Sequence, residues 1–488
     1  METQKTEGFL WDLVMLNFYR ADKQSLEALK QFFAVQKLHI SDFSIGFQYM
    51  WNKYLKPDCA FAGECLIIKE IYAGKTYFHY PISKNGDTCA EIAAIEAIEK
   101  HCRDTNLRLH FTNVPKSRLP LLALRYGREV NITNARRWRD YLYRAEDFKA
   151  YAGGRYSGQR NHVNKFKKSY PNWEFRVYTE ADYDAAVRFL KEYETVQHAK
   201  QAFLADEEMD EVFDVFPRIQ ELGLFCGLLT VDGQIVALSV GERCGDMVVV
   251  HIEKALRAYE GAYPMIAQQF ALAFCGDGVE FLNRMDDAGD AGLRKSKLQY
   301  LPAELVDKFN VIPKRAIDGV SRLPTIKTER LTLSPVKDAD VGTYARLASD
   351  TERNRYWGYD WREDCQEGTP PAKYFLDCAR EDFKHKAEMP LGIYLGKKLV
   401  GEVVLHRFGY TDEVEVGARV LPEAEGQGYA REAVKAYADY SFITLGLERV
   451  EAKCFRENAR SEKMLLGAGM RPCGSDETYL YFYKTASM

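Results

Sequence analysis

The chain has 488 residues, so it is too long for one hydrophobic core, and three domains of ordinary size are expected. Its 67 basic and 71 acidic residues nearly balance, which excludes a global attraction to nucleic acid. The 11 cysteines are scattered, without a C-x-x-C pair or close clustering with the 9 histidines, so the sequence predicts reduced thiols and no metal site.

The chain opens with polar residues, Met1 to Lys5, and no apolar stretch approaches the length of a membrane span. These features predict a cytoplasmic protein without a transmembrane segment. They leave its oligomeric state open.

A first α/β unit is predicted over residues 1–140. Strands are expected near 64–71 and 75–80, followed by a loop from Lys84 to Asp87. Apolar residues then recur at helical spacing between Ile92 and Ile98, and a strand is expected from Leu107 to Phe111, followed by Asn113.

A second unit, residues 141–312, repeats this order. Residues 225–241 are typical of a hairpin, because Asp232-Gly233 supplies the positive φ angles that a two-residue turn requires. A strand from Met247 to Ile252, a loop from Lys254 to Gly261, a helix-period run and a short strand before Asn283 follow.

Two charged segments of the second unit are candidate sites. The stretch from Arg155 to Tyr170 interleaves basic and aromatic side chains, which favours a nucleic-acid backbone or, equally, a solvated helix face. A second segment holds charged residues around several glycines, and it is typical of a folded polar site or of an internal ion-pair network. The candidate substrate-binding residues are Arg160, Arg284, Asp287, Arg294 and Lys297.

The segments Arg160-Asn161-His162, His251-Ile252-Glu253-Lys254 and 283–300 resemble a bacterial family related to the C-terminal domain of phosphatidylglycerol lysyltransferase. The resemblance covers residues about 20 to 312. It implies a tandem pair of GNAT-like folds, and transfer of an aminoacyl group from aminoacyl-tRNA to an amine or hydroxyl. The transmembrane region of the full lysyltransferases is absent, which puts a membrane lipid acceptor in doubt.

Residues 313–324, from Pro313 to Pro324, are the best linker candidate, and a third unit is predicted over 325–488. Its central feature is the loop from Glu423 to Ala430, which follows an alternating strand at 413–421 and precedes a helix-period run. Gly426 and Gly428 permit φ > 0 and close approach of a ligand. Because the unpaired N–H groups and the dipole of a helix N-terminus suit a phosphate, the loop predicts a pyrophosphate site.

Three motifs of the third unit resemble a GNAT-superfamily N-acetyltransferase of the ribosomal-protein-acetylating (RimJ/RimL) type, over residues about 325 to 488. They are Thr328 to Leu333, Gly426-Gln427-Gly428-Tyr429-Ala430, and Asn458-x-x-Ser461 with Gly469-Met470. The resemblance implies acetyl-CoA as co-substrate and direct attack by an amine acceptor. The cofactor-binding residues it implies are Val420, Gly426, Gln427, Gly428, Tyr429, Ala430 and Asn458.

The predicted catalytic residues are Ser461, Glu402 and Glu415. Ser461 would supply or relay the proton of the departing thiolate, or would only satisfy the start of a helix. The two glutamates would draw a proton from the amine, or would only face solvent. An aromatic run from Tyr356 to Tyr359 would be a wall for the acceptor, or core.

The predicted fold is therefore α/β, with three tandem GNAT-like mixed sheets flanked by helices. Only the third unit has Gly-x-Gly in the loop between its strand and its helix, so coenzyme A is expected there alone. Two hypotheses follow. Either the chain joins an acetyltransferase to an aminoacyl-tRNA-dependent transferase, or the N-terminal pair is a non-catalytic module that binds substrate or serves as a scaffold for one acetyltransferase domain.

Overall fold

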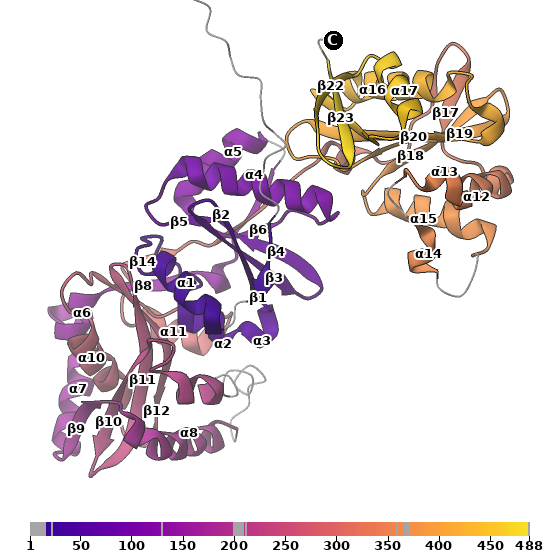
Figure 1. Cartoon of the computed structure of the whole chain (residues 1–488). Helices are drawn as coiled ribbons and strands as arrows, with labels where there is room; N and C mark the ends of the chain where they lie inside the picture. The colour runs from indigo at the N-terminus through magenta and orange to yellow at the C-terminus, as the bar shows by residue number, and fades with distance from the viewer. Residues whose placement is uncertain are drawn as a thin grey trace, which may run out of the picture.

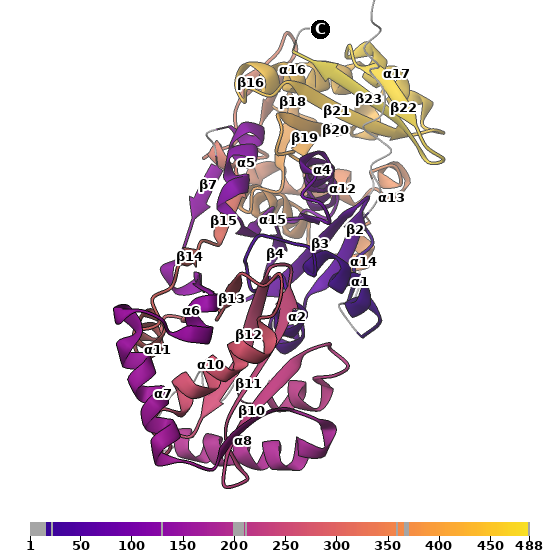
Figure 2. The ribbon, with the colours of Figure 1, turned by 90° about the vertical axis from the view of Figure 1, so that its left-hand side faces the viewer.

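The computed structural model describes residues 16–20, 23–127, 130–198, 209, 212–357, 360–365 and 370–486. The polar opening Met1 to Lys5 and the pair Gly358-Tyr359 lie outside the described residues. Three mixed sheets with helices on their faces confirm the predicted fold class. The first unit lies between the other two, and the third stands at one end of an elongated molecule (Figures 1 and 2).

The first sheet has eight strands. In spatial order these are β1 (Tyr19–Arg20), β2 (Asp58–Ala62), β3 (Cys65–Tyr72), β4 (Lys75–His79), β6 (Phe111–Val114), β15 (Phe309–Pro313) and β7 (Val130–Thr133), with β5 (Ile82–Ser83) paired to β3. The helices of this unit are α1 (Lys23–Phe33), α2 (Ile45–Met50), α3 (Asn52–Leu55), α4 (Thr88–Asp104) and α5 (Leu119–Tyr126).

Two boundaries of the first unit differ from the sequence analysis. The strand expected at Leu107 to Phe111 begins at Phe111 and includes Asn113, because the N–H of Leu109 is taken by the hydroxyl of Tyr410, 2.7 Å away. Residues 309–313, which close the predicted second unit, form β15 and pair with β6 and β7 of the first sheet. The chain therefore returns to the first unit before it enters the third.

The second sheet has seven strands, and its β10–β11 hairpin turns at Asp232 (φ 49°) and Gly233 (φ 76°), which confirms the predicted turn. The strands are β14 (Glu304–Val306), β8 (Asp140–Arg144), β13 (Phe281–Asn283), β12 (Met247–Ala255), β11 (Gln234–Cys244), β10 (Phe225–Val231) and β9 (Trp173–Val177). The helices are α6 (Ala145–Ala150), α7 (Ser157–Ser169), α8 (Tyr183–His198), α10 (Ala262–Phe274) and α11 (Ala291–Leu298).

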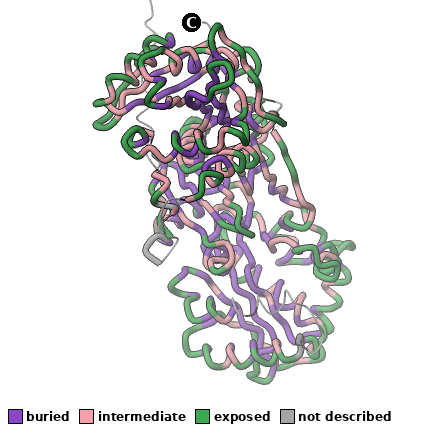
Figure 3. Tube along the Cα trace, turned by 90° about the vertical axis from the view of Figure 1, so that its right-hand side faces the viewer, coloured by how far each residue is buried: buried purple, intermediate pink, exposed green. Residues whose placement is uncertain are grey.

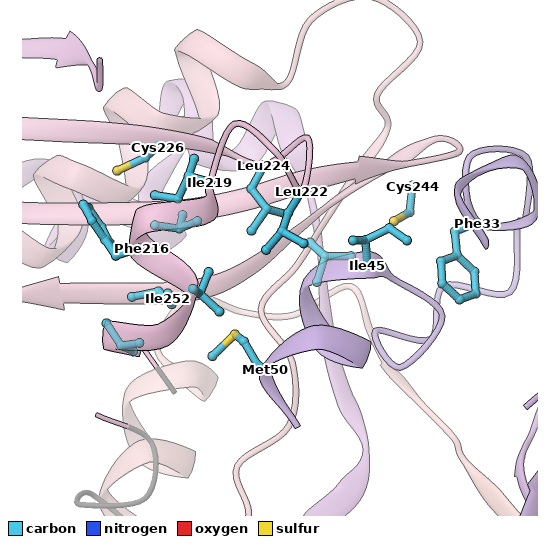
Figure 4. Packing of buried hydrophobic residues seen from close by; sticks show 14 of the residues in the cluster. Phe33, Ile45, Met50, Phe216, Ile219, Leu222, Leu224, Cys226, Cys244 and Ile252 are labelled. Carbon is cyan, nitrogen blue, oxygen red and sulfur yellow. The ribbon is translucent and has the colours of Figure 1, made fainter. Parts of the chain in front are cut away.

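The first and second units share one hydrophobic core. Phe33 of α1 and Ile45 and Met50 of α2 belong to the same buried cluster as Phe216 and Ile252 of the second unit (Figure 4). Buried residues continue along the strands of the sheets, whereas the exposed ones concentrate on helices and loops (Figure 3). The two units therefore form one packed body.

The third sheet again has eight strands, and α16 packs its apolar side on the face that carries Val414 and Val416. The strands are β16 (Ile326–Lys327), β17 (Leu331–Ser334), β18 (Met389–Leu395), β19 (Lys398–His406), β20 (Glu413–Val420), β21 (Arg449–Phe455), β23 (Tyr479–Thr485) and β22 (Arg471–Ser475). The helices are α12 (Val341–Ser349), α13 (Thr351–Asn354), α14 (Trp361–Asp364), α15 (Ala372–Lys384), α16 (Tyr429–Ile443) and α17 (Ala459–Gly467).

Each unit holds one pair of parallel strands that stay together for only two or three residues. These pairs are β4 with β6, β12 with β13, and β20 with β21. The same helix position follows the first strand of each pair, as α4, α10 and α16. The three units therefore share one internal plan.

The predicted linker is an ordered connection. Residues 316–319 form a 3₁₀ turn, and Asp318 pairs with Arg108 of the first unit at 2.6 Å. Arg315 donates to the carbonyl of Lys386 in the third unit at 2.9 Å. The segment thus joins the two bodies through hydrogen bonds on both sides. In the described part of the chain, no helix is long and apolar enough to span a bilayer.

Candidate active site

The glycine loop of the third unit leaves the start of α16 open. Gly426 and Gly428 have φ angles of +74° and +79°, and Gly428 is the N-cap residue of α16, without a side-chain cap. A Cβ atom built on Gly426 would meet no atom within 4 Å. The first N–H groups of α16 therefore face space that an anion can enter.

Arginines surround this open helix end. A Cβ atom on Gly428 would lie 3.5 Å from a guanidinium nitrogen of Arg330 and 3.6 Å from one of Arg431. Arg330 donates to the carbonyl of Gln427 at 3.1 Å and pairs with Glu432 at 2.7 Å, so it fixes the loop. Arg431 has no acidic partner among the described residues, which leaves its charge available to a ligand.

The loop's own acidic side chains are neutralised by further arginines. Glu425 lies between Arg353, at 3.0 Å, and Arg460, at 2.9 Å, while Glu423 pairs with Arg346 at 2.6 Å. The sequence analysis gave these cations no role, because they come from α12, α13 and α17 and gather only in the folded domain. Asp350 also pairs with Arg353, at 2.9 Å, so these ion pairs fix the loop and cancel the acidic charge that would repel a phosphate.

The predicted cofactor residues lie at the adjoining ends of three elements. β20 pairs with β21 only over Glu413 to Glu415, so its second half, which ends at Val420, runs free of β21. Gln427, Tyr429 and Ala430 belong to the loop and the first turn of α16. Asn458 begins α17, where its Oδ1 accepts the N–H of Ser461 at 3.1 Å.

Ser461 is placed by this cap in the first turn of α17. Its hydroxyl lies near the thiol of Cys454, the pKa of which burial raises to about 11. The side chain thus lies beside β21, near the point where β20 and β21 separate. Asn458 caps α17 through its Oδ1 atom, whereas its amide nitrogen has no partner among the described residues.

Glu402 is held in an internal ion pair. Its carboxylate lies 2.8 Å from Nε and 2.7 Å from Nη2 of Arg419, and it also accepts a hydrogen bond from the hydroxyl of Tyr344. Only 3% of the residue is exposed. These contacts favour a structural role for Glu402 over the predicted proton transfer, because both oxygens are already occupied.

Glu415 lies on the same face of the sheet, opposite His406 of β19. The imidazole Nε2 of His406 is 3.8 Å from Glu415 Oε1, and Arg407 is 3.5 Å from Oε2. Burial alone would raise the pKa of Glu415, but His406, Lys453 and Arg407 outweigh it and lower that pKa. Burial lowers the pKa of His406, so its imidazole is neutral at pH 7.

Aromatic side chains bound this face where the strands separate. The guanidinium of Arg419 lies over the ring of Trp357 at 4.4 Å, and a Cβ atom on Gly417 would meet that ring at 3.4 Å. Tyr356 lies 5.4 Å from Phe455 of β21, ring centre to ring centre. Tyr356 and Trp357 of the predicted aromatic run thus lie beside this face. The other two, Gly358 and Tyr359, lie outside the described residues.

One carboxyl group near this face was missed by the sequence analysis. Burial, with the nearby carboxylates of Asp382 and Glu402, raises the pKa of Glu388 to about 7. The residue directly precedes β18, and nothing in its local sequence marks it. Its raised pKa depends on the packing of α15 and β19 around it, which the local sequence does not indicate.

In the second unit, the predicted polar residues form a closed network. Asp287 is fully buried and accepts hydrogen bonds from Arg294 (2.9 and 3.0 Å), Arg136 (3.0 Å) and the hydroxyl of Tyr141 (2.7 Å). Burial alone would raise the pKa of Asp287, but the bonds from Arg294 and Tyr141 hold it well below its usual range. These contacts are those of an internal ion-pair network, the second of the two interpretations offered for this segment.

The other three predicted residues of this unit also have internal partners. Lys297 donates to the backbone carbonyls of Arg284, at 2.6 Å, and of Asp286. Arg284 pairs with Glu253 of β12 and lies over the ring of Tyr300 at 4.7 Å. Arg160 donates to carbonyls at the end of α6, including that of Gly153 at 2.6 Å. The structure brings Arg284, Asp287, Arg294 and Lys297 together and places Arg160 in a separate set of contacts.

Neither of the first two units has an open helix end at the position of the glycine loop. In the second unit, a Cβ atom on Gly261, the N-cap of α10, would lie 2.5 Å from the carbonyl oxygen of His162 in α7. In the first unit, the Asp87 carboxylate accepts the N–H groups of Cys89 (2.9 Å) and Ala90 (3.4 Å) at the start of α4. A backbone carbonyl in the second unit and a carboxylate in the first thus occupy the position that a phosphate would take.

The chain matches two family models. Residues 33–312 match the model described as phosphatidylglycerol lysyltransferase, C-terminal, and residues 330–471 match the acetyltransferase (GNAT) domain. Two curated relatives each match about a third of the chain. The uncharacterized N-acetyltransferase YoaA of Bacillus subtilis is 28% identical over 161 residues, which are 32% of this chain and 89% of that protein. The FsC-acetyl coenzyme A-N(2)-transacetylase of Aspergillus fumigatus is 36% identical over 169 residues, 33% of this chain and 70% of that protein.

One solved structure aligns over more than half of the chain. A conserved protein of unknown function from Bacteroides thetaiotaomicron aligns over 62% of this chain and all of its own length, with a TM-score of 0.58 and 24% identity. At this level of identity the likeness concerns the fold.

Proposed function

We propose that this chain, which belongs to the phosphatidylglycerol lysyltransferase C-terminal family and carries a GNAT-family N-acetyltransferase domain, transfers an acetyl group from acetyl-CoA to an amine in its third unit. In this proposal the tandem N-terminal pair is a non-catalytic scaffold. The observation that carries this proposal is the open start of α16. Gly426 and Gly428 leave space there for a ligand, and the guanidinium groups of Arg330 and Arg431 lie beside Gly428. A pyrophosphate fits this donor set.

In the proposed reaction, the nitrogen of a neutral amine attacks the thioester carbonyl, so a C–N bond forms and the C–S bond breaks. Glu415 receives the amine proton, directly or through water, because it is the carboxylate near the strand separation that is not locked to a single cation. Ser461 gives its proton to the departing thiolate and regains one, through water, from protonated Glu415, so that both residues return to their starting states. Acetyl-CoA supplies the acyl group and the leaving group.

Binding of acetyl-CoA tests the site. We expect the whole chain to be stabilised against heat by millimolar acetyl-CoA, by a shift of several degrees. Gly428→Trp should abolish the shift, because an indole there would fill the space between Arg330 and Arg431 and strain a residue with φ +79°. Gly446→Trp, at another positive-φ glycine with no atom within 4 Å of its Cβ position, is the matched control and should retain it. Binding retained in Gly428→Trp would contradict the loop assignment.

The scaffold role of the tandem pair is supported by the closed network around Asp287 and by the filled helix ends at Asp87 and Gly261. The competing function is transfer from aminoacyl-tRNA. Filter binding of charged and uncharged tRNA separates the two, and we expect neither to bind tightly at physiological salt. Salt-sensitive binding that prefers the charged form, and that is lost when Arg160 and Lys165 are both replaced by Glu, would overturn the scaffold.

A further inference from the structure

The end of α4 in the first unit lies against the third sheet, beside the proposed acetyl-transfer site. The Arg103 Nη1 atom is 2.6 Å from Glu413 Oε1 of β20 and 3.4 Å from Glu451 Oε2 of β21. These two strands pair only over residues 413–415 and 449–451. Glu413 belongs to the first of the three residue pairs and Glu451 to the last, so Arg103 bridges the whole short segment over which β20 and β21 pair, and it does so from a different domain.

A second contact of α4 reaches Glu415 through one shared cation. Arg407, which directly follows β19, places its Nη1 atom 3.4 Å from Asp104 Oδ1 and 3.5 Å from Glu415 Oε2. Its backbone has φ +52°, which side-chain-bearing residues rarely adopt, so its direction is set by surrounding structure. The guanidinium of Arg407 is thus divided between a carboxylate of the first unit and one of the third.

Titratable groups from four elements face Glu415. They are His406 and Arg407 at the end of β19, Glu451 and Lys453 of β21, Tyr481 of β23, and Arg103 and Asp104 of α4. The cations Arg103 and Arg407 stabilise ionised Glu415, whereas Asp104 draws Arg407 away from it. The two residues of α4 therefore act on this carboxylate in opposite directions.

We propose that α4 completes the acceptor face of the acetyltransferase domain, with Arg103 and Asp104 as positioning residues for Glu415. The proposal rests on the assignment of Glu415 as the proton acceptor in the proposed function. Its consequence is that the tandem pair is part of the acetyltransferase: the third unit alone has Glu415 and Arg407, but it lacks the two groups that balance them.

The test uses two variants of the full chain. Arg103→Gln removes a cation, so the acid limb of the kcat/KM profile should move to higher pH, by about half a unit or more. Asp104→Asn frees Arg407 for Glu415, so the same limb should move to lower pH. The reaction is acetyl transfer to a short peptide with a free amino terminus. A loosened interface alone would lower activity in both variants without opposite shifts of the profile.

A second readout does not need the reaction. Protonation of Glu415 is followed by NMR at the imidazole of His406, 3.8 Å away, with His406→Gln to assign the signal. Arg108→Gln is the control, since it breaks the Arg108–Asp318 pair in the same interface but does not face Glu415. Shifts of equal sign, or none, in the two α4 variants would overturn the proposal. If no peptide is acetylated but the NMR shifts have opposite signs, the positioning holds and the proposed reaction fails.

Discussion

At the scale of single residues, Glu70 and His79 form a buried pair in the first unit whose ionisation is displaced in both members. Burial raises the pKa of Glu70 to about 8 and lowers the pKa of His79 to about 4. Both side chains are therefore neutral near pH 7, and they share a hydrogen bond. Asn113 extends the chain from His79, at 3.4 Å, to Asp42, at 3.0 Å, and Asp42 is paired with Lys308.

This pair predicts that stability falls as pH rises from about 6.5 to 8. Between the ordinary pKa of a glutamate and about 8, the unfolded chain releases a proton that folded Glu70 keeps, so the free energy of unfolding decreases with pH. Glu70→Gln removes this proton while keeping a neutral hydrogen-bonding group. We expect the melting temperature of the variant to gain on the wild type steadily from pH 6.5 to 8. Folded His79 is neutral throughout this window, and the unfolded imidazole is mostly neutral above about pH 7.

A matched exposed variant, Glu96→Gln, should show no such pH-dependent gain, since Glu96 lies at the surface against Arg125. Parallel melting curves for wild type and Glu70→Gln over this pH range, measured by calorimetry, would show that Glu70 is ionised in the folded protein.

At the scale of elements, the sequence predicts what local pattern determines. The Asp232-Gly233 turn, the strand before the glycine loop and the helix start at Asn458 all lie where the residues indicate, because turn chemistry and periodicity act over a few neighbours. Gly426 and Gly428 are likewise readable, since positive φ and missing side chains are local properties.

Elements that depend on distant partners are not readable in this way. β15 has an ordinary strand pattern, yet nothing in it says that it pairs back to β6 and β7. The five arginines around the glycine loop, and the pairing of Glu402 with Arg419, arise only when separate elements meet. The sequence thus predicts the loop of the candidate site but neither its electrostatic surroundings nor which carboxylate near it stays available.

At the scale of the whole molecule, one aromatic side chain holds the third unit against the first. Tyr410 lies in the loop between β19 and β20, but its ring belongs to the buried core of the first unit, and its residue is 7% exposed. Its hydroxyl accepts the N–H of Leu109 at 2.7 Å. Together with the Arg103 and Asp104 contacts of α4, this ring fixes how the third unit packs on the first. The two units are therefore joined by specific contacts as well as by the connecting segment.

Tyr410→Ala should therefore undock the acetyltransferase domain without unfolding it. The substitution removes a buried ring, at a cost of about 3–5 kcal/mol, and leaves the Leu109 N–H without its partner. Limited proteolysis should then cleave the segment 313–324 faster than in the wild type, and release a fragment still stabilised by acetyl-CoA. Tyr410→Phe keeps the ring and loses only the hydroxyl, so its cleavage rate should fall between the two. If Tyr410→Ala is cleaved no faster than the wild type, the ion pairs of α4 are sufficient to hold the domain; if cleavage accelerates while the pH profile of acetyl transfer stays unchanged, docking holds the domain without tuning its chemistry.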